Sequence, residues 1–211
     1  MDYSQGLSRI SSRIGKASRV ISIDLETLVK DRFLNDERVI AISYATLDEK
    51  WDVKIADQTK ENDEIEIMQW LNDIMESYSP EIIIGYNHAS YDIPLMHTKM
   101  LNIPFDKQLW SLRYYFGTSY VLDMMYVCAL HGMYLKGEYR IRSLKNVVNA
   151  PEYRELNLVR AKDQIEIEGM NKGEAIEWLW KNDREKFKLY CKGDVLDLIT
   201  LYKYIFKGNL Q

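Results

Sequence analysis

Acidic side chains occur at three separated places in the chain, each close to the expected end or middle of a helix or strand. Asp24 and Glu26 lie two residues apart, Asp92 lies in a short polar segment, and Asp194 follows Tyr190 by four residues. If the four carboxylates converge, they repel one another unless hard divalent cations neutralise them, and Mg²⁺ or Mn²⁺ suits an all-oxygen site. Two such ions roughly 3.5–4 Å apart promote in-line displacement at phosphorus. The alternative for each acidic residue taken singly is helix capping or contact with solvent.

Two local patterns would position these groups. The segment 20–26 alternates as a buried strand, so Asp24 and Glu26 share one face and Ile23 faces the opposite side. The segment 183–206 has a helical apolar period, and residues four apart on a helix share a face. The Tyr190 hydroxyl and the Asp194 carboxylate therefore point the same way, and a phenol beside a carboxylate can orient a water molecule.

The remaining patterns favour an α/β layer fold, in which ligands bind beyond the carboxyl ends of the strands. We expect further strands at 39–46, 51–55 and 82–86, with a turn at 47–50. We expect further helices at 63–77, 91–101, 121–131, 143–148 and 172–180. The aromatic segment 110–120 could be a hairpin, a lid or part of the core, and the segment 153–170 is ambiguous.

Composition restricts the class of protein. The chain has 211 residues, 46% hydrophobic and 28% charged, which favours one soluble globular domain. No apolar run reaches the roughly 18 residues of a membrane span, and no secretory signal is visible at the N-terminus. Cys128 and Cys191 form no CxxC pattern, so we expect a reducing, cytoplasmic location and no structural zinc. The net charge of −4 argues against a broad clamp for duplex nucleic acid but permits a narrow single-strand groove.

The three acidic segments together resemble the exonuclease motifs of the DEDD superfamily. They match D-x-E-T at 24–27, G-Y-N-x-x-x-[FY]-D at 85–92 and Y-C-x-x-D at 190–194, in this order. The similarity is greatest to the 3′–5′ proofreading exonuclease domain of B-family DNA polymerases. The segments 121–124 and 143–145 also resemble that family, so the likeness extends over about residues 19–206.

The resemblance implies an RNase H-like (DnaQ-like) fold, with a mixed central β-sheet flanked by helices. It implies that two divalent ions, Mg²⁺ or Mn²⁺, are held by Asp24, Glu26, Asp92 and Asp194, and that Tyr190 orients the attacking water. Leu189 stands where the histidine branch of the superfamily carries its histidine, so the tyrosine branch is the better match.

The resemblance also implies substrate contacts and one structural residue. Thr27 and Leu28 would approach the terminal nucleotide, although Leu28 could equally belong to the core. Asn87 would touch the substrate or support its loop, and it could instead cap the following helix. His88 is expected to be a loop residue with phosphate contact as a secondary option, and Asp123 is expected to be structural.

We therefore expect a metal-dependent 3′–5′ exonuclease that hydrolyses single-stranded DNA ends to nucleoside 5′-monophosphates. A flexible basic arm at 1–18 would precede a single exonuclease domain at 19–211. The third motif lies close to the end of the chain, so we expect a stand-alone enzyme without a polymerase domain, associated with replication or repair proteins. The alternatives are an exoribonuclease with the same site and a non-catalytic nucleic-acid-binding protein on the same fold.

Overall fold

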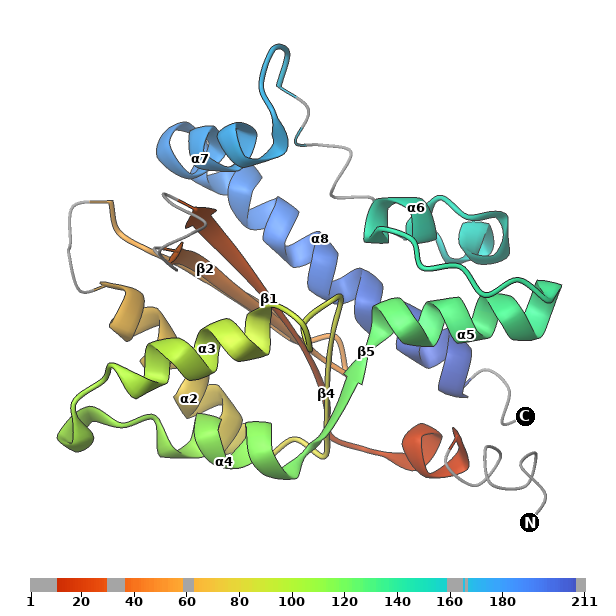
Figure 1. Ribbon diagram of the computed structural model, residues 1–211, viewed down its shortest axis with the longest axis horizontal. Coiled ribbons are helices and arrows are strands. Elements are labelled where there is room, and N and C mark those ends of the chain that lie inside the picture. Colours follow the sequence, from red (N-terminus) through yellow and green to blue (C-terminus); the bar gives the residue numbers. More distant parts are fainter. Residues whose placement is uncertain (1–10, 30–36, 59–62, 159–164, 166, 208–211) are drawn as a thin grey trace.

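A computed structural model describes residues 11–29, 37–58, 63–158, 165 and 167–207 (Figure 1). Within these residues the chain forms a five-stranded sheet in the order β3-β2-β1-β4-β5. β1 is antiparallel to β2 and parallel to β4; β2 and β3 are antiparallel, and β4 and β5 are parallel. The strands are β1 Val20–Val29, β2 Glu37–Thr46, β3 Trp51–Ile55, β4 Ile82–Gly85 and β5 Tyr120–Asp123. The expected mixed sheet of an α/β, RNase H-like fold is confirmed.

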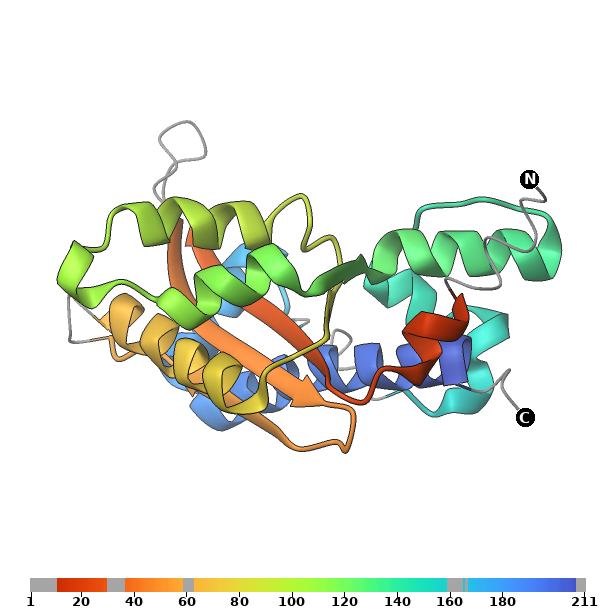
Figure 2. The same ribbon diagram turned by 90° about the horizontal axis from the view of Figure 1, so that it is seen from below.

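Helices cover the sheet on both faces. The α-helices are α2 Asp63–Tyr78, α3 Asp92–Leu101, α4 Trp110–Thr118, α5 Met124–Lys136, α6 Leu144–Val148, α7 Lys172–Asn182 and α8 Arg184–Tyr202. Short 3₁₀ segments are η1 Phe105–Lys107 and η2 Pro151–Leu156, and a π-helical turn, η4 Lys203–Lys207, follows α8. Figures 1 and 2 show α2, α3 and α4 gathered at one side of the molecule, while α5 and α6 lie beside the C-terminal half of α8.

Alternation along β1 divides its side chains between two environments. Ile21, Ile23 and Leu25 are buried in one core cluster with apolar residues of α2, α3 and α4. The opposite face of β1 carries Asp24 and Glu26 and meets α8. A second cluster joins β4 to α5, α6 and the C-terminal half of α8. The first cluster also includes Phe187, Tyr190 and Cys191 of α8, and the acidic residues of β1 lie beside this helix, close to Asp194.

The helix beginnings follow their capping residues. Asp183 accepts a hydrogen bond from the Lys186 amide at 3.0 Å and so begins α8, as the sequence predicted. Asn171 and Glu174 form a reciprocal capping box at the start of α7. Ser143 caps α6 through the Asn146 amide. These caps satisfy amide groups that a first helical turn leaves without intrahelical partners.

The prediction of a helix at 121–131 was wrong at its beginning. Residues Tyr120–Asp123 form β5, which pairs in parallel with β4, and the helix begins at Met124. Four residues are too few to show a strand period, and the pairing with β4 depends on a partner more than thirty residues away in sequence.

The aromatic segment after Gln108 is neither a hairpin nor a lid. It forms α4, in which Leu112 and Phe116 are buried while Trp110 and Tyr114 are exposed. Because aromatic residues occupy both the buried and the exposed faces of this helix, the sequence lacks a clear helical period there.

The described part of the expected N-terminal arm, residues 11–18, contacts the C-terminal end of the described chain. Residues 11–16 are helical, and the Tyr202 hydroxyl donates a hydrogen bond to the Ile14 carbonyl at 2.5 Å. Lys207 Nζ donates to the Ala17 carbonyl at 3.3 Å. Residues 1–10 lie outside the described residues, as do 159–164 and 166 of the segment that the sequence left ambiguous. The division into an arm and one domain therefore stays a prediction.

Within the described ranges, no helix combines the length and the apolar character that crossing a membrane requires. Cys128 and Cys191 are both buried and are not joined in a disulfide.

Candidate active site

An irregularity in the central strand follows the first acidic motif directly. In the pairing of β1 with β2, Glu26 lies opposite Ala41 whereas Thr27 lies opposite Val39, so Ile40 is an extra residue on β2. Such a bulge bends the strands locally and changes the direction of nearby side chains. Asp24 and Glu26 precede the bulge and point from the same face of β1, as the strand alternation predicted.

The last motif lies on α8, which packs across this face of the sheet. Tyr190 and Asp194 occur one turn apart and are 1% and 2% exposed, respectively. Glu26 is also buried, and Asp24 is half-buried. The carboxylates from the strand and the helix therefore meet in a region with little access for bulk water.

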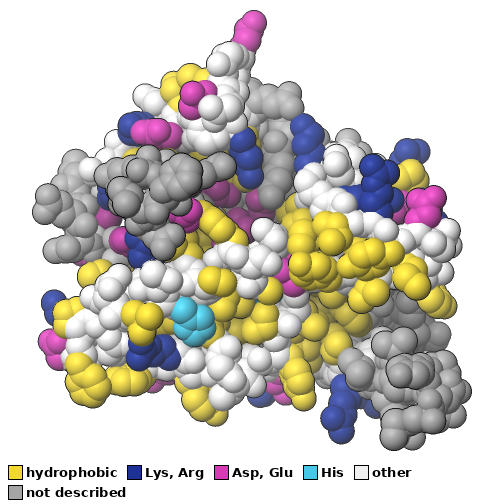
Figure 3. Space-filling model, in the orientation of Figure 1, with side chains coloured by type: hydrophobic (Ala, Val, Ile, Leu, Met, Phe, Trp, Pro, Cys, Tyr) yellow, Lys and Arg dark blue, Asp and Glu magenta, His cyan; other side chains and the backbone are white. Residues whose placement is uncertain are grey.

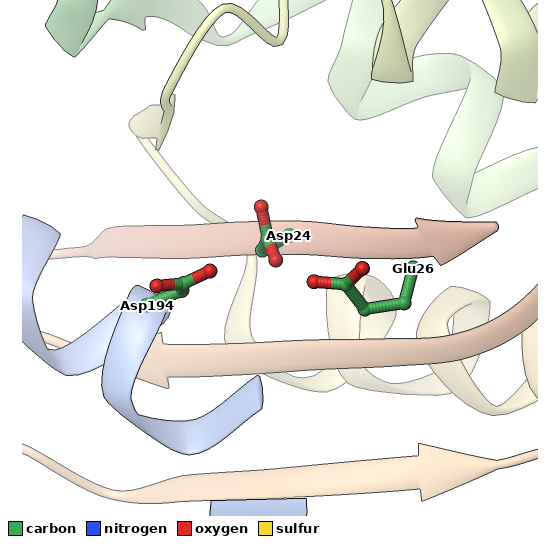
Figure 4. Close-up of side chains that lie close together, drawn as sticks. All are labelled: Asp24, Glu26 and Asp194. Carbon is green, nitrogen blue, oxygen red and sulfur yellow. The ribbon is translucent and has the colours of Figure 1, made fainter. Parts of the chain in front are cut away.

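Asp24, Glu26 and Asp194 come together as predicted. Each offers a carboxylate oxygen within 4.8 Å of those of the other two, and Figure 4 shows the three carboxylates facing one another between β1 and α8. Three negative charges at this separation repel strongly in a buried setting. An all-oxygen donor set of this kind fits a hard divalent cation such as Mg²⁺ or Mn²⁺.

Asp92 is not part of this three-residue group. It is buried and is the first residue of α3, at the positive end of the helix dipole, which favours its ionised form. Its assignment as a fourth metal ligand stays a prediction.

Tyr190 places a polar atom beside the carboxylates. Its hydroxyl is buried and has no hydrogen-bond partner among the described residues. Burial raises the pKa of Tyr190 well above its ordinary value, and the nearby charges of Glu26, Asp194 and Asp24 raise it further. The phenol therefore stays protonated at neutral pH. A buried hydroxyl without a partner next to an acidic cluster fits a site that takes up a water molecule or a hydrated ion.

The loop after β4 carries the second motif and is tied to the end of β5. Asn87 adopts a left-handed backbone conformation with φ of 61°. The Asp123 carboxylate accepts hydrogen bonds from the Asn87 amide at 2.8 Å and the Ala89 amide at 3.2 Å. This confirms the structural role expected for Asp123. Asn87 does not cap α3, because the N-cap position is Tyr91; its exposed side chain leaves the substrate contact a prediction.

The secondary option of phosphate contact for His88 is not supported. Its side chain is only 3% exposed, and it packs against Gly85, where an added Cβ would lie 2.7 Å from the His88 ring. Burial lowers the pKa of His88, although the Asp123 carboxylate 4.0 Å away opposes this shift. His88 is thus a neutral packing residue, and its burial depends on the missing side chain at Gly85.

Thr27 and Leu28 are placed differently from each other. The Thr27 hydroxyl lies 2.8 Å from the Tyr91 hydroxyl, which connects the first and second motifs. Leu28 is half-buried and packs against the core cluster around α2 to α4, in agreement with the core alternative. Contact of either residue with a nucleotide stays a prediction. The sequence analysis had given no role to Tyr91; its position beside Asp92 in the motif was the available signal.

Figure 3 shows the surface around this region. Acidic side chains are visible in a hollow near the centre of this face, with Lys and Arg side chains above it and a hydrophobic area beside it.

A pocket of about 340 Å³ lies between α6 and α7 and is lined in part by Ser143, Lys145, Asn171 and Lys172. Whereas Lys145 and Lys172 line this pocket, Lys192 lies over the Trp51 ring, 4.1 Å from the ring centroid, in a cation–π contact.

Comparisons with known proteins agree with this geometry. A family model described as the exonuclease domain of DNA polymerase family B matches residues 1–112, a range that contains the first two motifs. No curated protein matches the chain. Among solved structures, the chain is similar to the family B DNA polymerase from the hyperthermophilic archaeon Pyrobaculum calidifontis, with a TM-score of 0.62 and 16% sequence identity.

That structural match covers 89% of this chain and 24% of the polymerase, so the chain spans about a quarter of the polymerase's length. At this identity the match supports the fold. The family model covers more than half of the 211 residues. The chain belongs to the exonuclease domain family of family B DNA polymerases.

Proposed function

We propose that this chain is a metal-dependent 3′–5′ exonuclease that hydrolyses single-stranded DNA ends to nucleoside 5′-monophosphates. The observation that carries the proposal is the meeting of Asp24, Glu26 and Asp194, with carboxylate oxygens within 4.8 Å of one another. Solvation or helix capping explains single acidic residues, but neither explains three converging carboxylates from two elements on opposite sides of a buried interface. Phosphodiester hydrolysis by two metal ions requires this kind of donor set.

Asp24, Glu26 and Asp194 would hold the metal ions together with Asp92. When bound, two Mg²⁺ or Mn²⁺ ions supply positive charge that acidifies an attacking water and stabilises the leaving oxygen. The carboxylates of the chain fix the positions of the ions, and burial by α8 excludes competing water. Asp24 projects from β1 between the other two carboxylates in Figure 4, so its carboxylate would act together with either of them in holding a metal ion.

Tyr190 would orient the attacking water. A phenol with an ordinary pKa of about 10 is a poor general base at neutral pH, and the surroundings of Tyr190 raise its pKa further. Its hydroxyl can still donate a hydrogen bond or accept one from a water molecule. Tyr190 thus aims the nucleophile and does not itself remove its proton.

The substrate assignment rests on charge and family. A net charge of −4 does not suit a broad contact with duplex DNA. Lys145 and Lys172 line the pocket between α6 and α7 and offer local positive charge for a single strand. The solved relative is a DNA polymerase, which favours DNA over RNA. We place the activity in proofreading or repair, alongside replication or repair proteins.

The test compares one sequence as single-stranded DNA, RNA and blunt duplex DNA, each labelled at the 5′ end, with Mg²⁺ or with chelator. The chain itself should shorten single-stranded DNA stepwise from the 3′ end and release nucleoside 5′-monophosphates only with metal. Blunt duplex should be cut more slowly, because its ends must fray first. Faster cleavage of RNA would favour the exoribonuclease. Binding without cleavage in both Mg²⁺ and Mn²⁺ would favour the non-catalytic alternative.

A further inference from the structure

Asp123 lies where two parallel strands leave the sheet side by side. Gly85 ends β4 and Asp123 ends β5, and the two residues are register partners. The chain after Gly85 forms the loop that leads to Asp92, whereas the chain after Asp123 enters α5 directly. A side chain at Asp123 can therefore contact both departing segments at once.

The Asp123 carboxylate uses both of its oxygens. Oδ1 accepts hydrogen bonds from the Asn87 amide at 2.8 Å and the Met125 amide at 3.0 Å, and Oδ2 accepts one from the Ala89 amide at 3.2 Å. The Met125 bond is an ordinary helix cap. The other two bonds go to a different segment and lie on either side of His88. Capping α5 therefore accounts for one of the three bonds only.

A further hydrogen bond connects the loop held by Asp123 to the start of α3, where Asp92 lies. The His88 carbonyl accepts a hydrogen bond from the Ile93 amide at 3.0 Å, and Ile93 follows Asp92. The path from Asp123 to Asp92 thus contains two hydrogen-bonded steps. The His88 ring, buried against Gly85, holds the centre of the same loop in place.

We infer that Asp123 is a positioning residue for the nuclease site, acting through the loop at 87–89 on the placement of Asp92. The inference rests on the proposed function in so far as Asp92 binds a metal ion. Partners that orient metal-binding residues without touching the metal typically change metal affinity or activity by about 10–100-fold when they are replaced. Asp123 meets the description because it is buried and bonded to the loop backbone, and lies outside the carboxylate group formed by Asp24, Glu26 and Asp194.

Two substitutions separate loop positioning from helix capping. Asp123→Ser supplies a good N-cap for the Met125 amide, but its shorter side chain does not reach the amides of Asn87 and Ala89. Asp123→Asn has one accepting oxygen, which can keep the bonds at Oδ1 and loses the one to Ala89. The matched control is Asp183→Ser, which makes the same change at the N-cap of α8.

The first measurement is amide hydrogen exchange in the metal-free protein, read by NMR. In Asp123→Ser, the Asn87, Ala89 and Ile93 amides should exchange at least about 10-fold faster, while the Met125 amide stays protected. In Asp123→Asn only the Ala89 amide should lose most of its protection. Unchanged exchange at Asn87 and Ala89 in both variants overturns the inference. So does a loss of protection at the Met125 amide of Asp123→Ser that is as large as the loss at Asn87 and Ala89.

The second measurement is Mn²⁺ binding by calorimetry, followed by cleavage of single-stranded DNA. Asp123→Ser should weaken the binding of one Mn²⁺ ion and slow cleavage by about 10–100-fold. Asp123→Asn should have an Mn²⁺ affinity and a cleavage rate between those of this variant and the wild type. Asp183→Ser should match the wild type in both quantities. If the wild type cleaves nothing, the proposed function fails while exchange and Mn²⁺ binding still decide the role of Asp123. If the wild type cleaves and Asp123→Ser equals it in cleavage and Mn²⁺ affinity, the inference on Asp123 fails and the proposed function stands.

Discussion

The Thr27 hydroxyl lies 2.8 Å from the Tyr91 hydroxyl and links β1 to the residue that precedes α3. Tyr91 in turn donates to the Glu37 carboxylate at 2.6 Å. Because Tyr91 has a single hydroxyl proton and gives it to Glu37, Thr27 must be the donor to Tyr91. Burial, together with the bond to Glu37, raises the pKa of Tyr91 to about 12. One hydrogen bond therefore joins the first and second motifs, and a further bond connects Tyr91 to the start of β2.

Tyr91→Phe removes both bonds but keeps the ring. The free energy of unfolding should fall by about 1.5–3 kcal/mol, because one of the two bonds is to a charged carboxylate, and cleavage should slow because the link between the motifs is lost. Urea unfolding and single-turnover cleavage measure the two effects. The control is Tyr134→Phe, at a side chain that is 82% exposed on α5 and should change neither quantity. Wild-type stability and rate in Tyr91→Phe would show that the link has no consequence.

Gly85 and Gly117 should respond in opposite directions to the same substitution. A Cβ at Gly85 would lie 2.7 Å from the buried His88 ring, so Gly85→Ala should lower the free energy of unfolding by roughly 1–3 kcal/mol. A Cβ at Gly117, within α4, meets no atom within 4 Å, so Gly117→Ala should raise it by roughly 0.5–1 kcal/mol. Calorimetric melting of both variants checks the pair. Equal melting temperatures would contradict the packing of His88 on Gly85.

Tyr190→Phe should separate catalysis from stability. Loss of the hydroxyl should lower single-turnover cleavage by roughly 10²–10⁴-fold, the usual range for a positioned proton-transfer group. The metal-free protein should be equally or more stable, since the substitution removes a buried hydroxyl with no partner among the described residues. Mn²⁺ affinity should persist, because the carboxylates remain.

The matched control for that change is Tyr202→Phe on the same helix. It loses the hydrogen bond to the Ile14 carbonyl, so it should lower the free energy of unfolding by about 1 kcal/mol without changing the cleavage rate. If Tyr190→Phe cleaves at the wild-type rate, Tyr190 only packs. If Mn²⁺ binding is lost as well, the effect is structural.

Glu152 should make stability depend on acid pH. Burial alone would raise its pKa, but hydrogen bonds from Lys136 and Arg142, both at 2.8 Å, outweigh burial and hold the pKa at about 2. Since the folded-state pKa lies below the ordinary 4.5, this stabilisation is complete above pH 4.5 and is lost as the pH falls towards 2.

Glu152→Gln should therefore be less stable than the wild type at pH 7 by about 1.5–3 kcal/mol, the usual value of hydrogen bonds to a charged group. The difference should shrink steadily between pH 4.5 and pH 2. Urea unfolding of both proteins at a series of pH values measures it. A difference that is the same at every pH would contradict the role of the ion pairs.

The sequence predicted the parts of the site that depend on local spacing. Asp24 and Glu26 share a face because strands alternate, and Tyr190 and Asp194 share one because helices repeat every 3.6 residues. The packing of the His88 ring on Gly85 could not be predicted from spacing, since nothing in a loop sequence shows that an imidazole fills the space left by a missing Cβ. Lys192 was similarly unpredictable, because its position over Trp51 requires the packing of α8 on β3. β5 was missed because it is short and its pairing is not local.

The most direct test of the two-metal site is Mn²⁺ binding and cleavage of single-stranded DNA by Asp24→Ala. The wild type should bind two Mn²⁺ ions and cleave; Asp24→Ala should keep the native circular dichroism spectrum, bind Mn²⁺ much more weakly and show no cleavage. The exposed Asp106→Ala, in the 3₁₀ segment η1, should behave as the wild type. Near-normal cleavage by a well-folded Asp24→Ala protein would contradict the assignment of Asp24, Glu26 and Asp194 as the metal site of a nuclease.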